Sequence, residues 1–541
     1  MAITLPTVPT VAVKTHPGFC RGGFSPLKII ALAAALVALA PLAGVVWAAF
    51  GGSGADIAGR EIFRYAMTSA VLAVLVGGLT GVAGSIAAWL VVMHRFPGRS
   101  VFAWALALPL AAPAFAVAYA YADLFDVAGP LRFWLRETVG FDLPIQMRSI
   151  PGAAMVLSCA FYPYVYLAMR AAFLNQSSNL LDAARSLGCG SAEAFRRVAL
   201  PLARPALAAG IALAVMETLA DYGAVQFLSV QTLTTGVVRA WSVYGSTVSA
   251  ARFALPLLGA AALLLWIERQ GRKGRGFESG RARFREVEAT RLTGLRAAGA
   301  TSFCLMLLTM GLLLPLSWLI LRSIDVSPDW ARLAVAARNT LMFGGAGAVT
   351  TVLLATLLAP GAARLPVTAR LVSLGYATPG AVMAIGLLAP ASVVWSLFPG
   401  AASVAGVALS LVVYAYAARL MAAALEPIDG ALTKIPSSLD QAARSLGQSE
   451  LGSAWRVRLP LARGAMLTAL LIVFIDVLKE LPATLILRPF NVDTLAVLAS
   501  NYALDERLPQ AGWPAILIIL TALPAVIWLS RKIAAARPGE S

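Results

Sequence analysis

The sequence has few charged residues for its length, and this scarcity excludes an ordinary soluble protein. Only 13% of its 541 residues are Asp, Glu, Lys or Arg, whereas 59% are hydrophobic. Soluble domains carry about a quarter charged residues, so this chain could not cover its apolar surface with polar groups in water. The composition therefore predicts a membrane protein.

Residues for redox and metal chemistry are also scarce. The four cysteines form no CxxC pair, so neither a disulfide framework nor a thiol redox site is expected: Cys20, Cys159, Cys189 and Cys304. The two histidines, His16 and His94, lack metal-ligand spacing, and no stable metal site is expected.

Signatures of ATP binding and catalysis are missing as well. No G-x-x-x-x-G-K-[ST] phosphate loop and no nucleophile–base arrangement occurs in the sequence. The chain is therefore predicted not to be an enzyme, and energy for uphill transport must come from a partner or from an ion gradient.

Long apolar runs dominate what is present. Runs of about 20 apolar residues can cross about 30 Å of hydrocarbon as helices, and the alternating ten-residue pattern of barrel strands is missing. The run at 28–50 is too long for a cleavable signal and is expected to be the first span. An all-α polytopic membrane protein with about twelve spans is predicted, near residues 28–50, 66–93, 101–122, 152–174, 206–229, 252–268, 299–321, 340–360, 369–391, 401–424, 466–488 and 511–530.

The net charge of +17 is concentrated in alternate loops between these runs. With twelve spans all of these loops fall on one side, which the positive-inside rule makes cytoplasmic. Both termini are then expected in the cytoplasm, and nucleic-acid binding is not expected. Basic residues of this side include Lys14, Arg21, Lys28, Arg95, Arg99, Arg185, Arg196, Arg197, Arg204, Arg269, Lys273, Arg283, Arg364, Arg370, Lys434, Arg444, Arg456, Arg463, Arg531 and Lys532.

An internal repeat is the most informative feature. Residues 182–204 (DAARSLGCGSAEAFRRVALPLAR) and 441–463 (QAARSLGQSELGSAWRVRLPLAR) align without a gap at an offset of 259. Each copy follows an even number of spans, so the two halves have the same orientation and form a parallel repeat. Two domains are predicted, 1–275 with a repeated loop at 178–205 and 276–541 with a repeated loop at 437–464.

The repeated loop has its own local pattern. Residues 182–187 favour a short helix that Gly188 can end in a left-handed cap. A further helical turn carries Phe195 and Val198, and Leu200-Pro201 is expected to break it and begin the next span. A short exposed helix suits docking into a groove of another protein. An interfacial loop without a partner is the alternative, but the same surface in both halves favours one partner bound twice.

This pattern resembles the EAA loop of binding-protein-dependent ABC importers: Glu-Ala-Ala, three residues, Gly, nine residues, Ile-x-Leu-Pro. The sequence departs from it at the acidic position, which is Asp or Gln, and has Val for Ile in both copies. The resemblance implies the type I ABC importer permease fold, with both loops as coupling helices for a homodimeric ATPase that binds ATP and Mg in place of this chain. The matching residues are Asp182, Ala183, Ala184, Gly188, Val198, Leu200, Pro201, Gln441, Ala442, Ala443, Gly447, Val457, Leu459 and Pro460.

Further segments narrow the resemblance. ETLADYGAVQFL (217–228), TLTTGVVRAW (232–241), DVLKELPATLILRPF (476–490) and TLAVLASNYALDERL (494–508) are similar to the fused permeases of bacterial ferric-iron importers. That family implies a bacterial inner membrane, a periplasmic ferric-iron-binding protein as partner, and ferric iron as cargo. Related permeases carry thiamine, sulfate, polyamines or phosphonates, so another small solute such as thiamine is an alternative.

Ionisable residues occur in the span that follows each loop. Glu217 and Asp221 become Asp476 and Glu480 at the same offset, with Lys479 beside them. A spacing of four is one helical turn, so each pair is expected to face one direction. Such groups usually face a bundle interior or a wet path, and oxygen ligands suit a hard cation. They are predicted to line a translocation pathway; alternatively they tie helices together, with Lys479 paired to Asp476 or Glu480.

Tyrosines and prolines within the spans have structural interpretations. Tyr162, Tyr164 and Tyr166, echoed by Tyr414 and Tyr416, are expected to pack and to hydrogen-bond between helices. Pro113 and the Thr-Pro-Gly run at 378–380 are expected to kink or break their spans.

Two other classes of protein share some of these features. A secondary transporter also uses parallel repeats and intramembrane acids, but it needs no paired docking loops and would work without ATP. A membrane receptor or scaffold would bind a partner and move nothing. The paired loops favour the importer permease.

Overall fold

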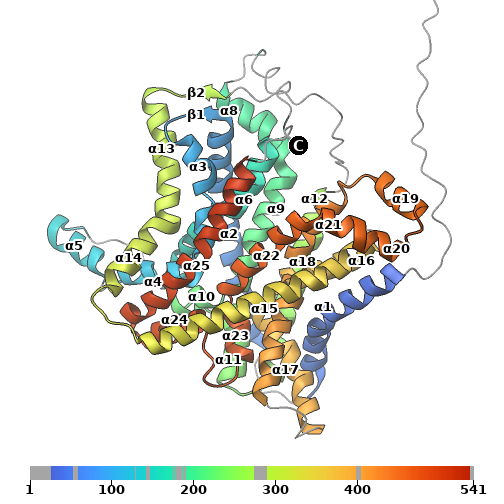
Figure 1. The fold of residues 1–541 in the computed structure, drawn as a ribbon. Helices are drawn as coiled ribbons and strands as arrows, with labels where there is room; N and C mark the ends of the chain where they lie inside the picture. Colours follow the sequence, from blue (N-terminus) through green and yellow to red (C-terminus); the bar gives the residue numbers. More distant parts are fainter. Residues whose placement is uncertain are drawn as a thin grey trace, which may run out of the picture.

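The computed structural model describes residues 26–52, 59–127, 129–141, 146–174, 176, 186, 190–272, 289–362, 364–397 and 404–535. Helices account for nearly all of their regular structure (Figure 1). The exception is a two-residue parallel ladder that pairs β1 (His94–Arg95) with β2 (Thr290–Arg291). Cys20, Cys189 and His16 lie outside the described residues.

The helices before the ladder's second strand are α1 (Pro26–Phe50), α2 (Gly59–Met93), α3 (Arg99–Ala105), η1 (Leu108–Ala111), α4 (Ala114–Phe125), α5 (Pro130–Val139), α6 (Ile150–Leu174), α8 (Ser191–Ala194), η2 (Phe195–Ala199), α9 (Leu200–Ala220), α10 (Gly223–Phe227), α11 (Leu233–Ser242) and α12 (Thr247–Arg272). Those after it are α13 (Gly294–Leu308), η3 (Thr309–Leu313), α14 (Leu314–Ser323), α15 (Trp330–Ala362), α16 (Pro366–Ala377), α17 (Gly380–Leu397), α18 (Val404–Leu432), α19 (Ser437–Ser445), α20 (Glu450–Ser453), η4 (Ala454–Arg458), α21 (Leu459–Leu461), α22 (Arg463–Leu478), α23 (Pro482–Leu487), α24 (Leu495–Leu504) and α25 (Leu508–Ala535).

The predicted all-α polytopic membrane protein is confirmed. Among the described residues, nine helices are long and apolar enough to cross a membrane, and three bent helix pairs raise the number to 12. The expected breaks at Pro113 and at 378–380 are present, and α16 and α17 meet at 104°. The residue before each proline, Ala112 or Thr378, has extended backbone (ψ 125° and 132°) because a following proline disfavours the helical conformation.

Two further predicted spans are interrupted without having been expected to break. The runs at 206–229 and 466–488 were each predicted as one span, but α9 ends at Ala220 and α22 ends at Leu478. Short helices α10 and α23 follow, and each is succeeded by a ten-residue helix, α11 or α24. The two halves therefore share an interruption that hydropathy alone does not reveal.

Equivalent hydrogen bonds show that the two halves have the same arrangement in space. The first N–H of α11, at Leu233, donates to the Ser69 hydroxyl on α2 at 2.9 Å. The first N–H of α24, at Leu495, donates to the Thr340 hydroxyl on α15 at 2.8 Å. Thus α2 and α15 are counterparts, as are α11 and α24.

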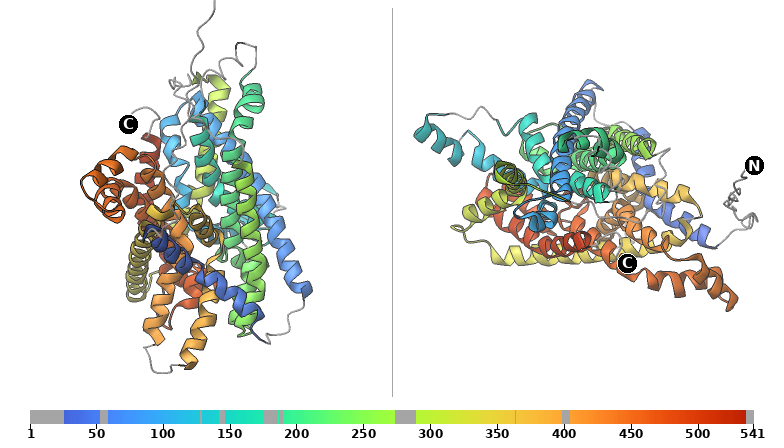
Figure 2. Two further views of the ribbon diagram at one scale, coloured as in Figure 1. Left: turned by 90° about the vertical axis from the view of Figure 1, so that its right-hand side faces the viewer. Right: turned by 90° about the horizontal axis from the view of Figure 1, so that it is seen from above.

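The first helix of each half packs on the other half. Figures 1 and 2 show α1 beside α17 and α18, where the Tyr414 hydroxyl donates to the Val37 carbonyl at 2.5 Å. Reciprocally, α14 lies beside α4, and Arg322 forms an ion pair with Asp123 at 2.7 Å. This exchange ties the two halves together along their length.

Three π-helical turns, η2, η3 and η4, each directly precede a Leu-Pro pair. The expectation that Leu200-Pro201 breaks the helix is wrong, because Phe195–Ala220 forms one continuous span. Proline lacks an N–H and its ring collides with the carbonyl four residues earlier, and the wider π turn relieves that collision. The second copy differs, since its helix bends by 71° at Ala462.

Candidate functional site

A cavity opens where the ends of α9 and α22 meet α6, α18 and the break before α4. All five predicted pathway residues border it. Their meeting in one cavity could not be predicted from either segment of sequence alone. Its lining comprises Leu110, Ala112, Pro113, Ala114, Phe115, Ala160, Phe161, Tyr164, Glu217, Ala220, Asp221, Tyr222, Gly223, Arg419, Leu420, Asp476, Lys479, Glu480, Leu481 and Pro482.

Asp221 occupies the break between α9 and α10. Its backbone is extended (ψ 133°), and its carboxylate accepts the N–H groups of Ala224 at 3.0 Å and Val225 at 3.1 Å. Glu480 has the same position in the second half, where it accepts the Ala483 N–H at 3.2 Å. A carboxylate at a helix N-terminus satisfies free donors and complements the helix dipole. The helix ends between the members of each pair, so the spacing of four is not one turn of a continuous helix, but all four acids border the same cavity.

Two cations accompany the acids of the second half. Lys479 Nζ lies 3.0 Å from Asp476 Oδ1, which is one of the pairings that the sequence left open. The Arg419 guanidinium, on α18, forms an ion pair with Glu480, and the two side chains are 11% and 5% exposed. Sequence reasoning missed Arg419, although a lone arginine in the apolar run 401–424 was itself a signal.

Glu217 differs from the other three acids. It is half-buried in the last turn of α9, and within the described ranges its carboxylate has no hydrogen bond or ion pair. Among the residues that the structure describes, four acids and two cations border the cavity, which leaves a formal excess of two acidic groups. No three His, Cys, Asp or Glu side chains of the described chain come together as a metal-binding group. The arrangement offers carboxylate oxygens to a passing cation without a closed ligand set.

The tyrosines divide between packing and the cavity. Tyr166 donates to the Ala103 carbonyl at 3.0 Å, and the Tyr416 and Thr484 hydroxyls lie 2.5 Å apart. Tyr164 borders the cavity, whereas the buried Tyr162 hydroxyl has no hydrogen-bond partner in the described part of the chain. Tyr166 and Tyr416 thus make the interhelical hydrogen bonds that were expected.

A glycine lets α17 approach the acid–base pair. A Cβ atom added at Gly380 would overlap the Glu480 carboxylate. The corresponding first residue of α4 is Ala114, so the first half accommodates a methyl group there. The Glu480–Arg419 pair therefore depends on close contact with the start of α17.

The second repeated loop lies entirely within the described residues, and it folds as a short helix, α19, with a left-handed cap. Gly447 has φ +82°. Its N–H donates to the Arg444 carbonyl at 3.0 Å, and the Gln448 N–H donates to the Ala443 carbonyl at 3.0 Å. These two bonds form a Schellman motif. In the first copy Asp182, Ala183, Ala184 and Gly188 lie outside the described residues.

α19 projects from the bundle with most of its surface uncovered (Figure 1). Gln441 and Ala442 are exposed, Ala443 is buried, and Leu446 is 83% exposed. The segment after α19 is attached more firmly, because Glu450 forms an ion pair with Arg364. Farther along, Val198 and Val457 are half-buried, as are Leu200 and Pro201, while Leu459 is buried and Pro460 is exposed.

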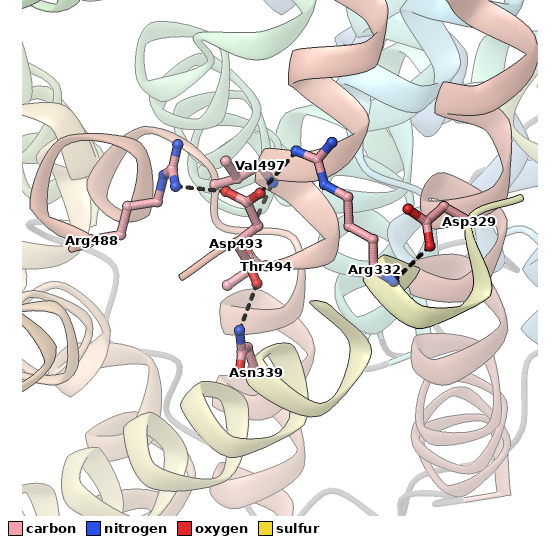
Figure 3. A network of polar contacts seen from close by, with 7 residues as sticks. All are labelled: Asp329, Arg332, Asn339, Arg488, Asp493, Thr494 and Val497. Atoms are coloured by element: carbon pink, nitrogen blue, oxygen red, sulfur yellow. Dashed lines mark hydrogen bonds and ion pairs between the residues drawn. The ribbon is translucent and has the colours of Figure 1, made fainter. Parts of the chain in front are cut away.

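A polar network stabilises the loop that joins α23 to α24, at the end of the bundle away from α19 (Figure 3). The Asp493 carboxylate binds Arg488 at 2.6 Å and Arg332 at 3.2 Å. The Asp493 carbonyl accepts from the Asn339 amide at 3.0 Å. Phe490, within this loop, is 98% exposed. The network fixes a loop that carries an uncovered aromatic side chain.

Comparison with known proteins identifies the family. Residues 80–269 and 347–536 both match the family described as "Binding-protein-dependent transport system inner membrane component". The Fe(3+)-transport system permease protein FbpB 2 of Haemophilus influenzae is 25% identical over 468 residues, which cover 83% of this chain and 86% of that protein.

Two shorter likenesses are to permeases named for sulfate and for molybdenum transport. The sulfate transport system permease protein CysT of Salmonella typhimurium is 32% identical over 149 residues, 28% of this chain and 52% of that protein. The molybdenum transport system permease protein ModB of Escherichia coli is 32% identical over 141 residues, 26% and 60% respectively. Since the family match occurs twice and covers more than half of the residues, the chain belongs to the binding-protein-dependent inner-membrane components, and it is a multi-pass ABC permease subunit, a transport component and not an enzyme.

Proposed function

We propose that this permease imports ferric iron, which a periplasmic ferric-iron-binding protein delivers, into the cytoplasm. The observation that carries the proposal is the acidic excess of the cavity between the two halves. Carboxylate oxygens attract a hard cation, and in a poorly screened site they repel oxyanions such as sulfate and molybdate. The likeness to FbpB 2 over 83% of the chain supports the same cargo.

The energy for this transport comes, in our proposal, from a homodimeric ATPase that binds ATP and Mg. One ATPase subunit docks at each repeated loop, so a single chain with repeats 1–275 and 276–541 receives two. The exposed α19 and its Leu446 side chain support docking. The coupling residues are those of the repeated pattern, from Asp182 to Pro201 and from Gln441 to Pro460. Both termini then lie in the cytoplasm, with the loops.

Closure of the two ATPase subunits would rock the halves between outward-facing and inward-facing states. The cavity at the ends of α9 and α22 lies between the halves and would be exposed to each side in turn. Glu217, Asp221, Asp476, Lys479 and Glu480 are the proposed pathway residues.

Thiamine is a second candidate cargo for a specific reason. It carries a positive charge, so the acidic excess that disfavours sulfate does not disfavour thiamine. The cavity chemistry therefore separates cations from anions, and the choice among cations needs an experiment.

The test uses proteoliposomes that contain the chain, its ATPase and its binding protein. Uptake of radiolabelled ferric iron, thiamine and sulfate is measured in parallel, with and without ATP. The proposal expects ATP-dependent uptake of ferric iron alone. ATP-dependent uptake of thiamine or sulfate in place of ferric iron would overturn the proposed cargo. Ferric flux without ATP would overturn the proposal that ATP hydrolysis drives transport.

A further inference from the structure

In the described part of the chain, both cations at the cavity belong to the second repeat. At the offset of 259 that aligns the repeats, Arg419 corresponds to Ala160 and Lys479 corresponds to Ala220. All four of these residues border the same cavity, so the correspondence holds in space as well as in sequence. The acids, in contrast, are present in both repeats.

These cations occupy the acids beside them. Arg419 binds Glu480, which also accepts the Ala483 N–H, and Lys479 binds Asp476 at 3.0 Å. In the first repeat, Asp221 is engaged by two N–H groups of α10. Glu217 makes no hydrogen bond or ion pair in the described structure, and Arg419 and Lys479 act on it only through longer-range electrostatic attraction.

We propose that Arg419 and Lys479 are built-in counter-cations that close the second repeat's acids to small cations, so that the cargo meets the cavity at Glu217 of the first repeat. A monovalent cation that displaced Arg419 from Glu480 would leave a largely buried guanidinium without its partner, which is costly. Coulomb attraction scales with charge, so a multivalent cation competes for the carboxylates far better than a monovalent one. The two residues thereby select for high charge and limit leakage through an acid-lined path.

This inference rests on the proposed function only in that the cargo is a cation. Its test replaces each cation by the first-repeat residue, Arg419→Ala and Lys479→Ala, in the full chain with ATPase and binding protein in proteoliposomes. The first readout is passive thallium(I) entry without ATP, followed with an enclosed thallium-sensitive dye. The second readout is the KM and kcat of ATP-driven ferric uptake.

Each alanine variant is expected to raise thallium entry about tenfold and to lower both KM and kcat of ferric uptake, because freed acids hold a cation more tightly. Arg419→Lys and Lys479→Arg keep the charge but change the side chain, and thallium entry is expected to stay low in both, which separates the effect of the charge from that of the side chain. Arg419→Ala combined with Glu480→Gln removes the pair as a unit, while the amide oxygen can still accept the Ala483 N–H. That double variant is expected to restore low thallium entry.

Thallium entry that stays at the unmodified level in Arg419→Ala and Lys479→Ala overturns the inference, and so does high entry in the paired variant. If Arg419→Ala does not assemble, Lys479→Ala decides, since its ion pair is more exposed, at 19% and 17%. Thallium entry does not depend on ferric cargo. Raised thallium entry without ferric uptake therefore supports the counter-cations and rejects the iron proposal. Ferric uptake with unchanged thallium entry supports the iron proposal and rejects the counter-cations.

Discussion

The two repeats agree in their backbone contacts and differ in their charges. In each, a carboxylate accepts at least one N–H at the start of a short helix, and a hydroxyl on the long helix accepts the first N–H of α11 or α24. The second repeat alone adds Arg419 and Lys479 at the cavity. The pseudo-symmetric contacts therefore specify the fold, and the asymmetric charges are the part of the molecule available for selecting cargo.

The ends of the bundle show the same division. Ten residues separate the starts of α10 and α11, against thirteen between those of α23 and α24. The longer segment carries Arg488, Asp493 and the exposed Phe490. At the other end, both repeated loops keep a π turn before their Leu-Pro pair, although the second copy also bends by 71° at Ala462. Shared features at one end and unequal loops at the other are what one ATPase dimer and one delivery protein would require.

The largest expected effect breaks the equivalence of the repeated loops. Gly447→Asp adds a negative charge at a helix C-terminus, where the helix dipole disfavours it, on the exposed surface proposed to dock the ATPase. We expect ATP-driven uptake to fall about tenfold or more. We also expect less ATPase to co-purify with the chain.

Gly447→Asn is the matched control, because asparagine has nearly the same shape as aspartate without the charge, and both residues can adopt the left-handed conformation. It should transport nearly as well as the unmodified chain. If the repeats are equivalent at this end, Gly188→Asp should cause a loss of the same size, and a harmless Gly188→Asp would break the comparison.

The next effect concerns the close contact beside the cavity. Gly380→Ala would drive a methyl group into the Glu480 carboxylate, and such overpacking costs about 2–3 kcal/mol. A lower thermal unfolding temperature in detergent should report this cost. The reciprocal change, Ala114→Gly, should cost only about 0.5–1 kcal/mol, and equal shifts for both variants would contradict the asymmetry.

The network in Figure 3 provides a test of the longer loop. Asp493→Ala removes the shared partner of Arg488 and Arg332 and should destabilise the chain by about 1–2 kcal/mol, since Arg332 is half exposed. The unfolding temperature measures this loss. Gln231→Ala, an exposed position in the shorter loop of the first repeat, should change stability by less than about 0.5 kcal/mol. A shift as large as that of Asp493→Ala would contradict the difference between the loops.

The smallest expected effect tests whether the long helices α2 and α15 make equivalent contacts. Ser69→Ala and Thr340→Ala each remove the hydroxyl that accepts the first N–H of α11 or α24. Each should cost about 1 kcal/mol in unfolding free energy, the usual net value of a buried hydrogen bond. Clearly unequal losses would argue that the two contacts are not equivalent.

Much of the fold could be predicted because its signals are local. Apolar runs locate the spans, Pro113 and Pro379 mark two breaks, and the gapless repeat anticipates the left-handed cap that Gly447 adopts. The break predicted at Leu200-Pro201 was wrong, because a π turn accommodates Pro201 within a continuous helix.

The cavity depended on contacts that sequence spacing does not encode. The acid pairs were predicted from their repeat, but the helix ends at Ala220 and Leu478 follow from carboxylates that capture the N–H groups of the next short helix. The pairing of Arg419 with Glu480 joins residues on two helices far apart in the chain. The exchange of α1 and α14 between halves is likewise long-range.

The most direct test of the unequal cavity compares Glu217→Gln with the paired removal Asp476→Asn and Lys479→Ala. Glu217 and Asp476 occupy equivalent positions in the two repeats. The second variant, however, removes an acid together with its counter-cation and leaves the net charge of the cavity unaltered. ATP-driven ferric uptake should show kcat/KM about tenfold lower for Glu217→Gln, equivalent to about 1.4 kcal/mol, and nearly unchanged for the paired variant, with binding-protein-stimulated ATP hydrolysis retained in both. Equal losses in the two variants, or no loss in Glu217→Gln, would contradict the account.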